Sequence, residues 1–421
     1  MLQKSLKPEA FKIAVSTYLE NNKFSTAKPD DLWQAFTTDI TNDQQRGPKN
    51  VSQFMFGWTN TRGYPVVFAD KSDDGTITLS QVRLTIKRFS LNVQKSFSTY
   101  EDTKDFWIPI TMTTATEQNF LSTAVKTWLQ GDYEKISIES PDKWFILNIQ
   151  QSGYYRVNYD TKSWKLLIEA LNSNHTVIHV TNRAQIIDDL LNLARAGWVD
   201  YEVVLQGATY LLEEHDYVPW KAFFNGMSFL LQRYQGQNGE DLLKKYILLL
   251  ATNVYVKLGF DDVKEESHLN KLNRELILSW MCKLSHTHCV ETSVRKFAEW
   301  HEGKIYSIPP DTKAAIYCTT IRNGDPNDWY FLWDQYQKTN FASEKKIILD
   351  ALGCSKDKKI LYNYLSSSSH SYIDKALKSD YTGDIRKQDF NAVLASIYNS
   401  GEYGVNTMLD FVVNYHERLR E

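Results

Sequence analysis

The apolar residues in the second half of this chain recur with a helical period, and this pattern constrains the possible folds more than any other feature. The segment "NRAQIIDDLLNLARAG" (182–197) is the clearest case. Its apolar stripe consists of Ile187, Leu190, Leu191 and Ala194. Asn182 and Gln185 have the spacing of an N-terminal capping box, and Gly197 predicts the helix end.

Similar helical segments follow to the end of the chain. They include "YEVVLQGATYLLEE", "EDLLKKYILLLATNVYVKLG", "LNRELILSWMCKL", "PDTKAAIYCTTI" and "EKKIILDALGC". Short connections between helices of similar length favour antiparallel pairs stacked side by side. We therefore predict a large α-helical solenoid after Asp160. The segments follow no strict repeat period, so HEAT-like or armadillo-like describes the architecture only.

The segment before these helices, from Gly63 onward, has a period of two. The runs "YPVVFAD", "GTITLSQVRLTI", "FWIPITMT" and "KWFILNI" are β-branched and aromatic, and turns such as "KSDDGT" separate them. The run "YYRVNYD" alternates between two faces, which are Tyr155, Val157 and Tyr159 on one side and Arg156, Asn158 and Asp160 on the other. Because no helical pattern intervenes, we predict a small antiparallel β-sandwich.

Residues 1–61 return to the helical pattern. Phe11, Ala14, Val15 and Tyr18 form the stripe of an amphipathic helix, and Pro29 with two following acids is typical of another helix start. The predicted fold is therefore multidomain and mainly α, with a short helical segment, a small sandwich and a helical solenoid.

Size and charge exclude several functional classes. A chain of 421 residues favours roughly two to four domains. The formal net charge of −3 offers no basic face for nucleic acid. The N-terminus lacks the apolar core of a secretory signal, and the run "YILLLATNVYVKLGF" is too short and too interrupted to span a bilayer. Taken literally, these features describe a soluble cytosolic chain.

The cysteines permit three interpretations. The four cysteines are Cys282, Cys289, Cys318 and Cys354. In "MCKLSHTHC", Cys282, His286, His288 and Cys289 could ligate zinc, but neither the C-x₂₋₄-C nor the H-x₃₋₅-H spacing is present. Two disulfides need only a helix ending near Leu284 and a return of the chain at Cys289, which leaves His286 and His288 as exposed loop residues. Four reduced thiols packed as small hydrophobes are the third interpretation. Spacing alone ranks disulfides slightly above thiols, and zinc below both.

Two N-glycosylation sequons favour a secreted chain. They are "NVS" at Asn50 and "NHT" at Asn174, both in polar contexts typical of loops.

The sequence contains no recognisable catalytic constellation. H-E-x-x-H is absent, since "HEGKI" has Ile305 where the second histidine would stand, and no G-x-S-x-G, P-loop or dinucleotide fingerprint occurs. The run "SSSSH" (366–370) is interpreted as a serine-rich loop. The acidic pairs Asp188–Asp189 and Glu213–Glu214 are interpreted as solvated helix faces or local caps.

Nine short runs in order along the chain carry a family resemblance. They are "QFMFGWTNTRGYPVV", "LSQVRL", "WIPI", "GYYRVNYD", "NRAQIIDDLLNLARAG", "VPW", "YC" at 317–318, "ALGCS" and "IRKQD". Together they resemble the C-terminal portion of aminopeptidase N-type zinc metallopeptidases, and insect membrane alanyl aminopeptidases in particular. The resemblance covers essentially the whole chain.

The resemblance implies a domain division and a disulfide pairing. Residues 1–61 are similar to the terminal helices of the catalytic domain, 62–158 to the β-sandwich, and 159–421 to most of the helical C-terminal domain. The family's two bridges have the separations of Cys282–Cys289 and Cys318–Cys354. The family's zinc motif, third zinc ligand, catalytic tyrosine and exopeptidase motif lie upstream of the matching region. We therefore expect a portion of a family protein, with zinc in the parent enzyme and neither cofactor nor catalytic residue in this chain.

The resemblance also implies a role. In the family, the helical domain closes over the catalytic domain, caps the active-site cavity and gates the entry of peptide substrates. Arg386 in "IRKQD" is a candidate contact for a substrate carboxylate, and an ordinary surface arginine is the competing interpretation. The resemblance places the protein on the extracellular face of the plasma membrane or in the secretory pathway, with its anchor outside this chain, and allows a homodimer.

Two other functional classes stay open. One is an extracellular binding module, a receptor ectodomain for a toxin, a virus or a protein partner, as in insect relatives. The other is a free-standing cytosolic scaffold, which predicts reduced cysteines.

Overall fold

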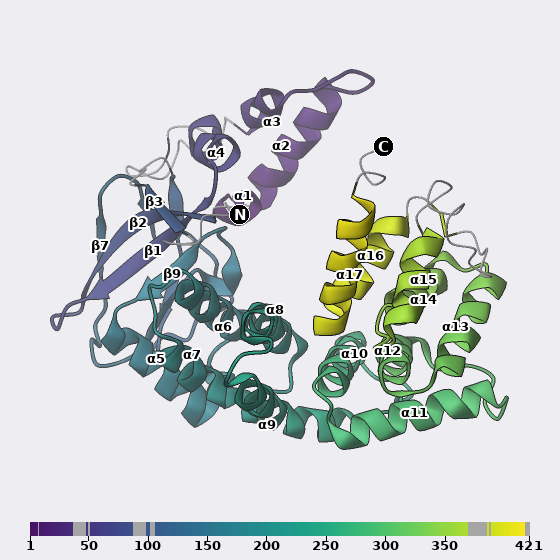
Figure 1. The fold of residues 1–421 in the computed structure, drawn as a ribbon. Helices are drawn as coiled ribbons and strands as arrows, with labels where there is room; N and C mark the ends of the chain where they lie inside the picture. Colours follow the sequence, from purple (N-terminus) through teal and green to yellow (C-terminus); the bar gives the residue numbers. More distant parts are fainter. Residues whose placement is uncertain are drawn as a thin grey trace. The chain divides into compact units, whose positions relative to one another are not determined.

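The computed structural model describes two compact units (Figure 1). The described residues are 1–6, 8–36, 48, 51–86, 98–101, 106–368, 385–386 and 389–416. Unit 1 comprises Met1–Tyr210 and Val218–Met227, and unit 2 comprises Leu211–Tyr217 and Ser228–Glu421. The three-domain division implied by the resemblance stays a prediction.

Unit 1 begins with four helices, α1 (Leu2–Ser5), α2 (Pro8–Asn21), α3 (Pro29–Ala35) and α4 (Val51–Asn60). Helix α3 starts at Pro29 as the sequence predicts, and the Asp31 carboxylate accepts a hydrogen bond from the backbone N–H of Lys28 at 2.7 Å. A small apolar cluster of Ala14, Phe36 and Val51 holds these helices together.

A five-stranded sheet follows. Its strands are β1 (Tyr64–Lys71), β2 (Thr76–Ile86), β3 (Ser98–Glu101), β7 (Glu134–Ser137) and β9 (Arg156–Tyr159). β1 and β2 form an antiparallel hairpin at the predicted "KSDDGT" turn, where Gly75 has φ +85°. β9 pairs with β1 in parallel, with Val66 opposite Arg156. The sheet is therefore mixed, which amends the predicted all-antiparallel arrangement. Two parallel strands need a long connection between them, and the chain from β2 to β8 provides it between β1 and β9.

Unit 1 also contains two further strand pairs. β4 (Ile108–Ile110) pairs with β6 (Thr127–Leu129), and β5 (Met112–Thr114) pairs with β8 (Phe145–Leu147). The apolar face predicted for "YYRVNYD" is buried, and the Tyr159 hydroxyl accepts a hydrogen bond from the backbone N–H of Leu147 at 3.0 Å.

Three helices follow β9 in unit 1: α5 (Thr161–Asn174), α6 (Val180–Arg195), which packs against β9, and α7 (Tyr201–Ala208), which packs against α5 and α6. The predicted α6 stripe is buried. The N-cap residue is nevertheless His179, three residues before the predicted cap, and Asn182 lies buried inside the first turn. The capping-box spacing therefore did not identify the start of this helix. The side chain of Asn182 instead donates to the backbone carbonyl of Asn148, which follows β8. Helix α8 (Tyr217–Tyr234) contributes residues to both units.

Unit 2 is a succession of helices, consistent with the predicted solenoid (Figure 1). They are α9 (Glu240–Leu258), α10 (His268–Lys283), α11 (Thr287–His301), α12 (Lys313–Asn323), α13 (Pro326–Lys338), α14 (Ala342–Leu352), α15 (Lys358–Ser368), α16 (Phe390–Asn399) and α17 (Glu402–Tyr415). Helices α10, α12, α14 and α16 pack successively against one another, while α11 and α13 connect and cover them. The mainly α, multidomain fold class is confirmed. Among the described helices, none has the length and apolar character that a bilayer crossing requires.

Candidate functional site

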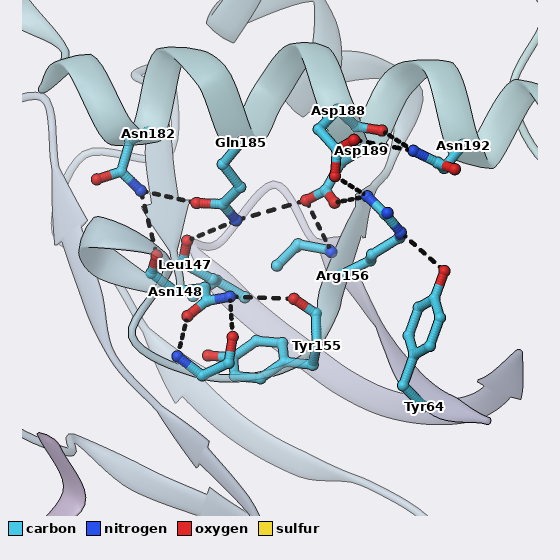
Figure 2. A network of polar contacts seen from close by, with 12 residues as sticks. Tyr64, Leu147, Asn148, Tyr155, Arg156, Asn182, Gln185, Asp188, Asp189 and Asn192 are labelled. Atoms are coloured by element: carbon cyan, nitrogen blue, oxygen red, sulfur yellow. Dashed lines mark hydrogen bonds and ion pairs between the residues drawn. The ribbon is translucent and has the colours of Figure 1, made fainter. Parts of the chain in front are cut away.

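A buried ion pair joins β9 to α6 in unit 1 (Figure 2). The guanidinium of Arg156 contacts the carboxylate of Asp188 and lies 3.0 Å from Oδ1 of Asp189. Its Nε donates to the hydroxyl of Tyr64 at 3.0 Å. The side chain of Asp189 is 2% exposed, that of Arg156 17% and that of Asp188 30%. The pair forms because Arg156 is on the sheet face that α6 covers.

The carboxylate of Asp189 also accepts hydrogen bonds from two N–H groups. Its Oδ2 accepts the N–H of Val157 at 3.1 Å and an amide N–H of Gln185 at 3.4 Å. Burial raises the pKa of Asp189 to about 7, although the opposite charge of Arg156 acts to lower it. Burial lowers the pKa of Arg156, but the two aspartates outweigh it and leave a net rise. At neutral pH, the carboxylic acid of Asp189 can therefore hold or release a proton.

The interpretation of Asp188–Asp189 as a solvated face was wrong for Asp189. The missed signal was the charge of Arg156 on a strand whose other face is apolar, since a buried cation needs a carboxylate partner. Of the other acidic pair, Glu214 is buried and accepts the N–H groups of His215 and Asp216, both at 2.9 Å. Glu214 is thus a local cap, one of the two roles predicted for it.

A second polar cluster holds the chain between β8 and β9. Asn148 has φ +60° and is fully buried. Its amide nitrogen donates to the carbonyls of Gly153 and Tyr155, both at 3.0 Å, and its Oδ1 accepts the Gly153 N–H at 2.7 Å. Asn182 of α6 donates to the Asn148 carbonyl at 3.2 Å, so this loop is fastened to the helix as well (Figure 2).

A pocket of about 260 Å³ lies beside these groups. Its lining consists of Tyr64, Gln151, Gly153, Tyr154, Tyr155, Arg156, Asp188 and Asp189. A Cβ at Gly153 would lie 2.2 Å from the Tyr155 ring, so this wall requires glycine. The arrangement offers one partly exposed carboxylate, one guanidinium and tyrosine rings, which suits recognition of a small charged group.

Both cysteine pairs named by the resemblance are bonded. The Cys282–Cys289 bridge links the last turn of α10 to the first turn of α11, and Cys318–Cys354 links α12 to the end of α14. The helix before Cys289 ends at Lys283, close to the predicted Leu284. These four sulfurs are thus not available as thiolate ligands. Within the described ranges, no group of three or more histidine, cysteine or acidic side chains is placed to hold a metal ion.

The two histidines of "MCKLSHTHC" lie at the start of helix α11. His286 is the N-cap residue of α11 and half-buried, and His288 lies in the first turn of that helix. Nδ1 of His288 is 2.7 Å from the hydroxyl of Tyr255 on α9, and the rings of His286 and Tyr255 are 4.9 Å apart. Burial, together with the neighbouring His288, lowers the pKa of His286. His288 is exposed as predicted, but it lies in a helix and not in a loop, because α11 begins at Thr287, before the second cysteine.

The remaining predicted residues have other partners. Arg386 is exposed, and its Nε donates to Asp389 at 2.7 Å. Asn174 is exposed at the end of α5, and its Oδ1 accepts the hydroxyl of Thr176 at 2.6 Å. Asn50 and the end of the "SSSSH" run lie outside the described residues.

Comparisons with known proteins agree on one family. Residues 144–421 match the sequence model of the ERAP1-like C-terminal domain. The chain is 32% identical to aminopeptidase N of Plutella xylostella over 98% of its own length, and 28% identical to aminopeptidase N of Homo sapiens over its full length. It is 30% identical over 89% of its length to the thyrotropin-releasing hormone-degrading ectoenzyme of Homo sapiens. It spans 42%, 42% and 35% of these relatives, respectively, so each of them is much longer.

Proposed function

This chain belongs to the ERAP1-like C-terminal domain family, and on that premise we propose that it is the C-terminal region of a zinc-dependent aminopeptidase. The observation that carries the proposal is the similarity of nearly the whole chain to proteins named as aminopeptidases. Such an enzyme removes N-terminal residues from peptides, and peptides are therefore the proposed partners.

The proposed role of this region is to cap the active-site cavity and to gate the entry of peptides. A cap of this kind excludes water and positions a substrate without making or breaking bonds itself. The helical succession in unit 2 supports this role, because stacked helix pairs form the extended surfaces by which solenoids bind other chains.

The zinc ion of the proposed enzyme is held outside residues 1–421. Two observations support this division. All four cysteines are in disulfides, and the described part of the chain offers no cluster of histidine and acidic side chains with metal-binding geometry. When bound in the parent enzyme, zinc would supply a Lewis acid and an activated water. The residues of this chain would contribute the stability and the shape of the cap.

The test uses the purified 421-residue chain. We expect less than about 0.1 zinc per chain by mass spectrometry of the metal and no hydrolysis of alanyl-p-nitroanilide, because a catalytic zinc site needs three protein ligands in tetrahedral geometry. Human aminopeptidase N assayed in parallel is the positive control. Stoichiometric zinc with measurable turnover would refute the proposal that the zinc site lies outside residues 1–421. Saturable binding of a toxin or other protein without any turnover would instead favour the binding module.

Arg386 is the proposed contact with a substrate carboxylate. Its exposed guanidinium keeps donors available beyond the one that bonds Asp389. In the complete enzyme, Arg386→Ala should raise KM for peptides of several residues and leave KM for alanyl-p-nitroanilide unchanged, since that substrate carries no carboxylate. An unchanged KM for the peptides would eliminate this role.

The proposed location is the extracellular face of the plasma membrane or the secretory pathway. One relative is named an ectoenzyme, and another, from Manduca sexta, is named a membrane alanyl aminopeptidase. Two disulfides within unit 2 support an oxidising compartment.

A further inference from the structure

The pocket beside Arg156 has the size of a single side chain. Its volume of about 260 Å³ is below the roughly 300–1,000 Å³ typical of pockets for drug-sized ligands. It lies within unit 1, between the start of β1, the chain before β9 and α6. A ligand that fills it would thus be one extended group, such as a side chain presented by a peptide.

The charge of the pocket favours a cation. Arg156 carries one positive charge and Asp188 one negative charge, and Asp189 adds a second negative charge when it is ionised, so the lining carries between 0 and −1 at neutral pH. No further charged side chain is among the described residues that line the pocket. Arg156 is already balanced by both carboxylates, whereas Asp188 is the more exposed of the two. An anion entering here would therefore meet the charge of Asp188, and a cation would be attracted to it.

Aromatic rings supply the second element of cation recognition. The ring centres of Tyr64 and Tyr154 are 5.8 Å apart, with 65° between the ring planes, and Tyr154 is 68% exposed. The guanidinium carbon of Arg156 lies 5.6 Å from the centre of the Tyr64 ring. The ring of Tyr64 thus already makes a cation–π contact with Arg156, and the accessible ring of Tyr154 can make such a contact with a second cation.

The rim of the pocket is held in an unusual backbone conformation. Gln150 and Gln151 both have φ +53°, next to Asn148 at +60°. Residues other than glycine adopt this region at a cost, and they persist there only where their surroundings fix them. Here the amide of Asn148 and the side chain of Asn182 supply that constraint, since the N–H of Gln150 donates to Asn182 at 2.9 Å. A rim fixed before binding reduces the entropy that a ligand would lose.

We propose that this pocket binds one organic cation, the ammonium or guanidinium group of a lysine or arginine side chain presented by a peptide. The cation lies between Asp188 and the ring of Tyr154. The Asp188 carboxylate accepts hydrogen bonds from the charged group, in addition to those from Arg156 and Asn192.

Binding of N-acetyl-lysine methylamide to the purified chain tests the proposal. Ligand-observed NMR should give saturable binding for this probe, and none for the uncharged norleucine analogue, which lacks the ammonium group, or for the anionic glutamate analogue. Asp188→Asn keeps the shape but removes the charge, so it should weaken binding about tenfold, the effect of losing a charge-assisted hydrogen bond. Tyr154→Ala should weaken it about two- to fivefold, the typical effect of an exposed cation–π contact.

Two matched variants serve as controls. Asp73→Asn changes an exposed acid of the β1–β2 turn and Tyr133→Ala changes another exposed tyrosine, and both should leave the affinity unchanged. Equal binding of the norleucine analogue, or preference for glutamate, would overturn the proposal. An unchanged affinity in Tyr154→Ala would overturn it too, even if Asp188→Asn failed to fold. None of these outcomes depends on zinc or aminopeptidase activity.

Discussion

Asp189 and Arg156 form a buried ion pair, Oδ1 to Nη1 at 3.0 Å, that connects helix α6 to strand β9. The same carboxylate accepts the N–H of Val157, so one side chain satisfies both a charge and a backbone donor of the edge strand. Removing one partner from such a pair leaves an uncompensated charge, and this is costly in a protein interior.

We expect Arg156→Gln to destabilise unit 1. The substitution leaves two adjacent carboxylates without their cation, and breaking a buried pair in this way costs about 3–5 kcal/mol. Urea unfolding followed by tryptophan fluorescence measures the loss. Lys162→Gln is the matched control, since Lys162 pairs with Asp73 in full exposure and its loss should not change the free energy of unfolding. Equal effects of the two substitutions would contradict the prediction.

The stability of the chain should depend on pH through Asp189. Burial raises its pKa from 3.8 to about 7 on folding, so the folded state binds the proton more tightly than the unfolded state. The stability contributed by protonation is then complete below about pH 4 and is lost as pH rises through about 7.

The free energy of unfolding of the wild type, relative to Asp189→Asn, should therefore fall between about pH 4 and about pH 7. A rise of about three pKa units sets a fall of about 4 kcal/mol as the upper limit. Urea titrations at several pH values measure it. Parallel pH profiles for the two proteins would show that Asp189 does not titrate in this range.

The two disulfides should differ in their contribution to stability. Cys318–Cys354 spans a sequence separation of 36 and Cys282–Cys289 one of 7. The loop-closure entropy removed from the unfolded chain gives about 4 kcal/mol for the longer loop and about 2.5 kcal/mol for the shorter. Replacing each pair by two alanines and measuring thermal unfolding compares them. A larger loss from the short bridge would contradict the entropic account.

Asn174 should carry a glycan when the chain passes through a secretory pathway. Its side chain is exposed, and the Thr176 hydroxyl already bonds to it. Asn174→Gln and Thr176→Ala should each remove the same glycan, seen as loss of the mass shift that peptide-N-glycosidase removes. Asn172→Gln, an exposed neighbour outside any sequon, should leave the glycan in place. A glycan that persists in Thr176→Ala would refute the assignment.

The sequence by itself determined the classes of the elements and their order. The stripe of Ile187, Leu190 and Leu191 is buried as its helical period predicts, and the apolar face of "YYRVNYD" is buried as its alternation predicts. Such periods are local properties of the chain, so they can be recognised without knowing what covers each face.

Only the tertiary structure decided which polar side chains are buried and which partners they bind. Asn182 has the spacing of a helix cap but fastens the loop at Asn148, and Asp189 has the appearance of a solvated acid but is buried against Arg156. These partners are about 30 residues apart, 32 between Asp188 and Arg156 for example, and they meet because β9 pairs with β1 and α6 then covers it. Whether a charge is solvated or buried depends on that long-range packing, which no local spacing encodes.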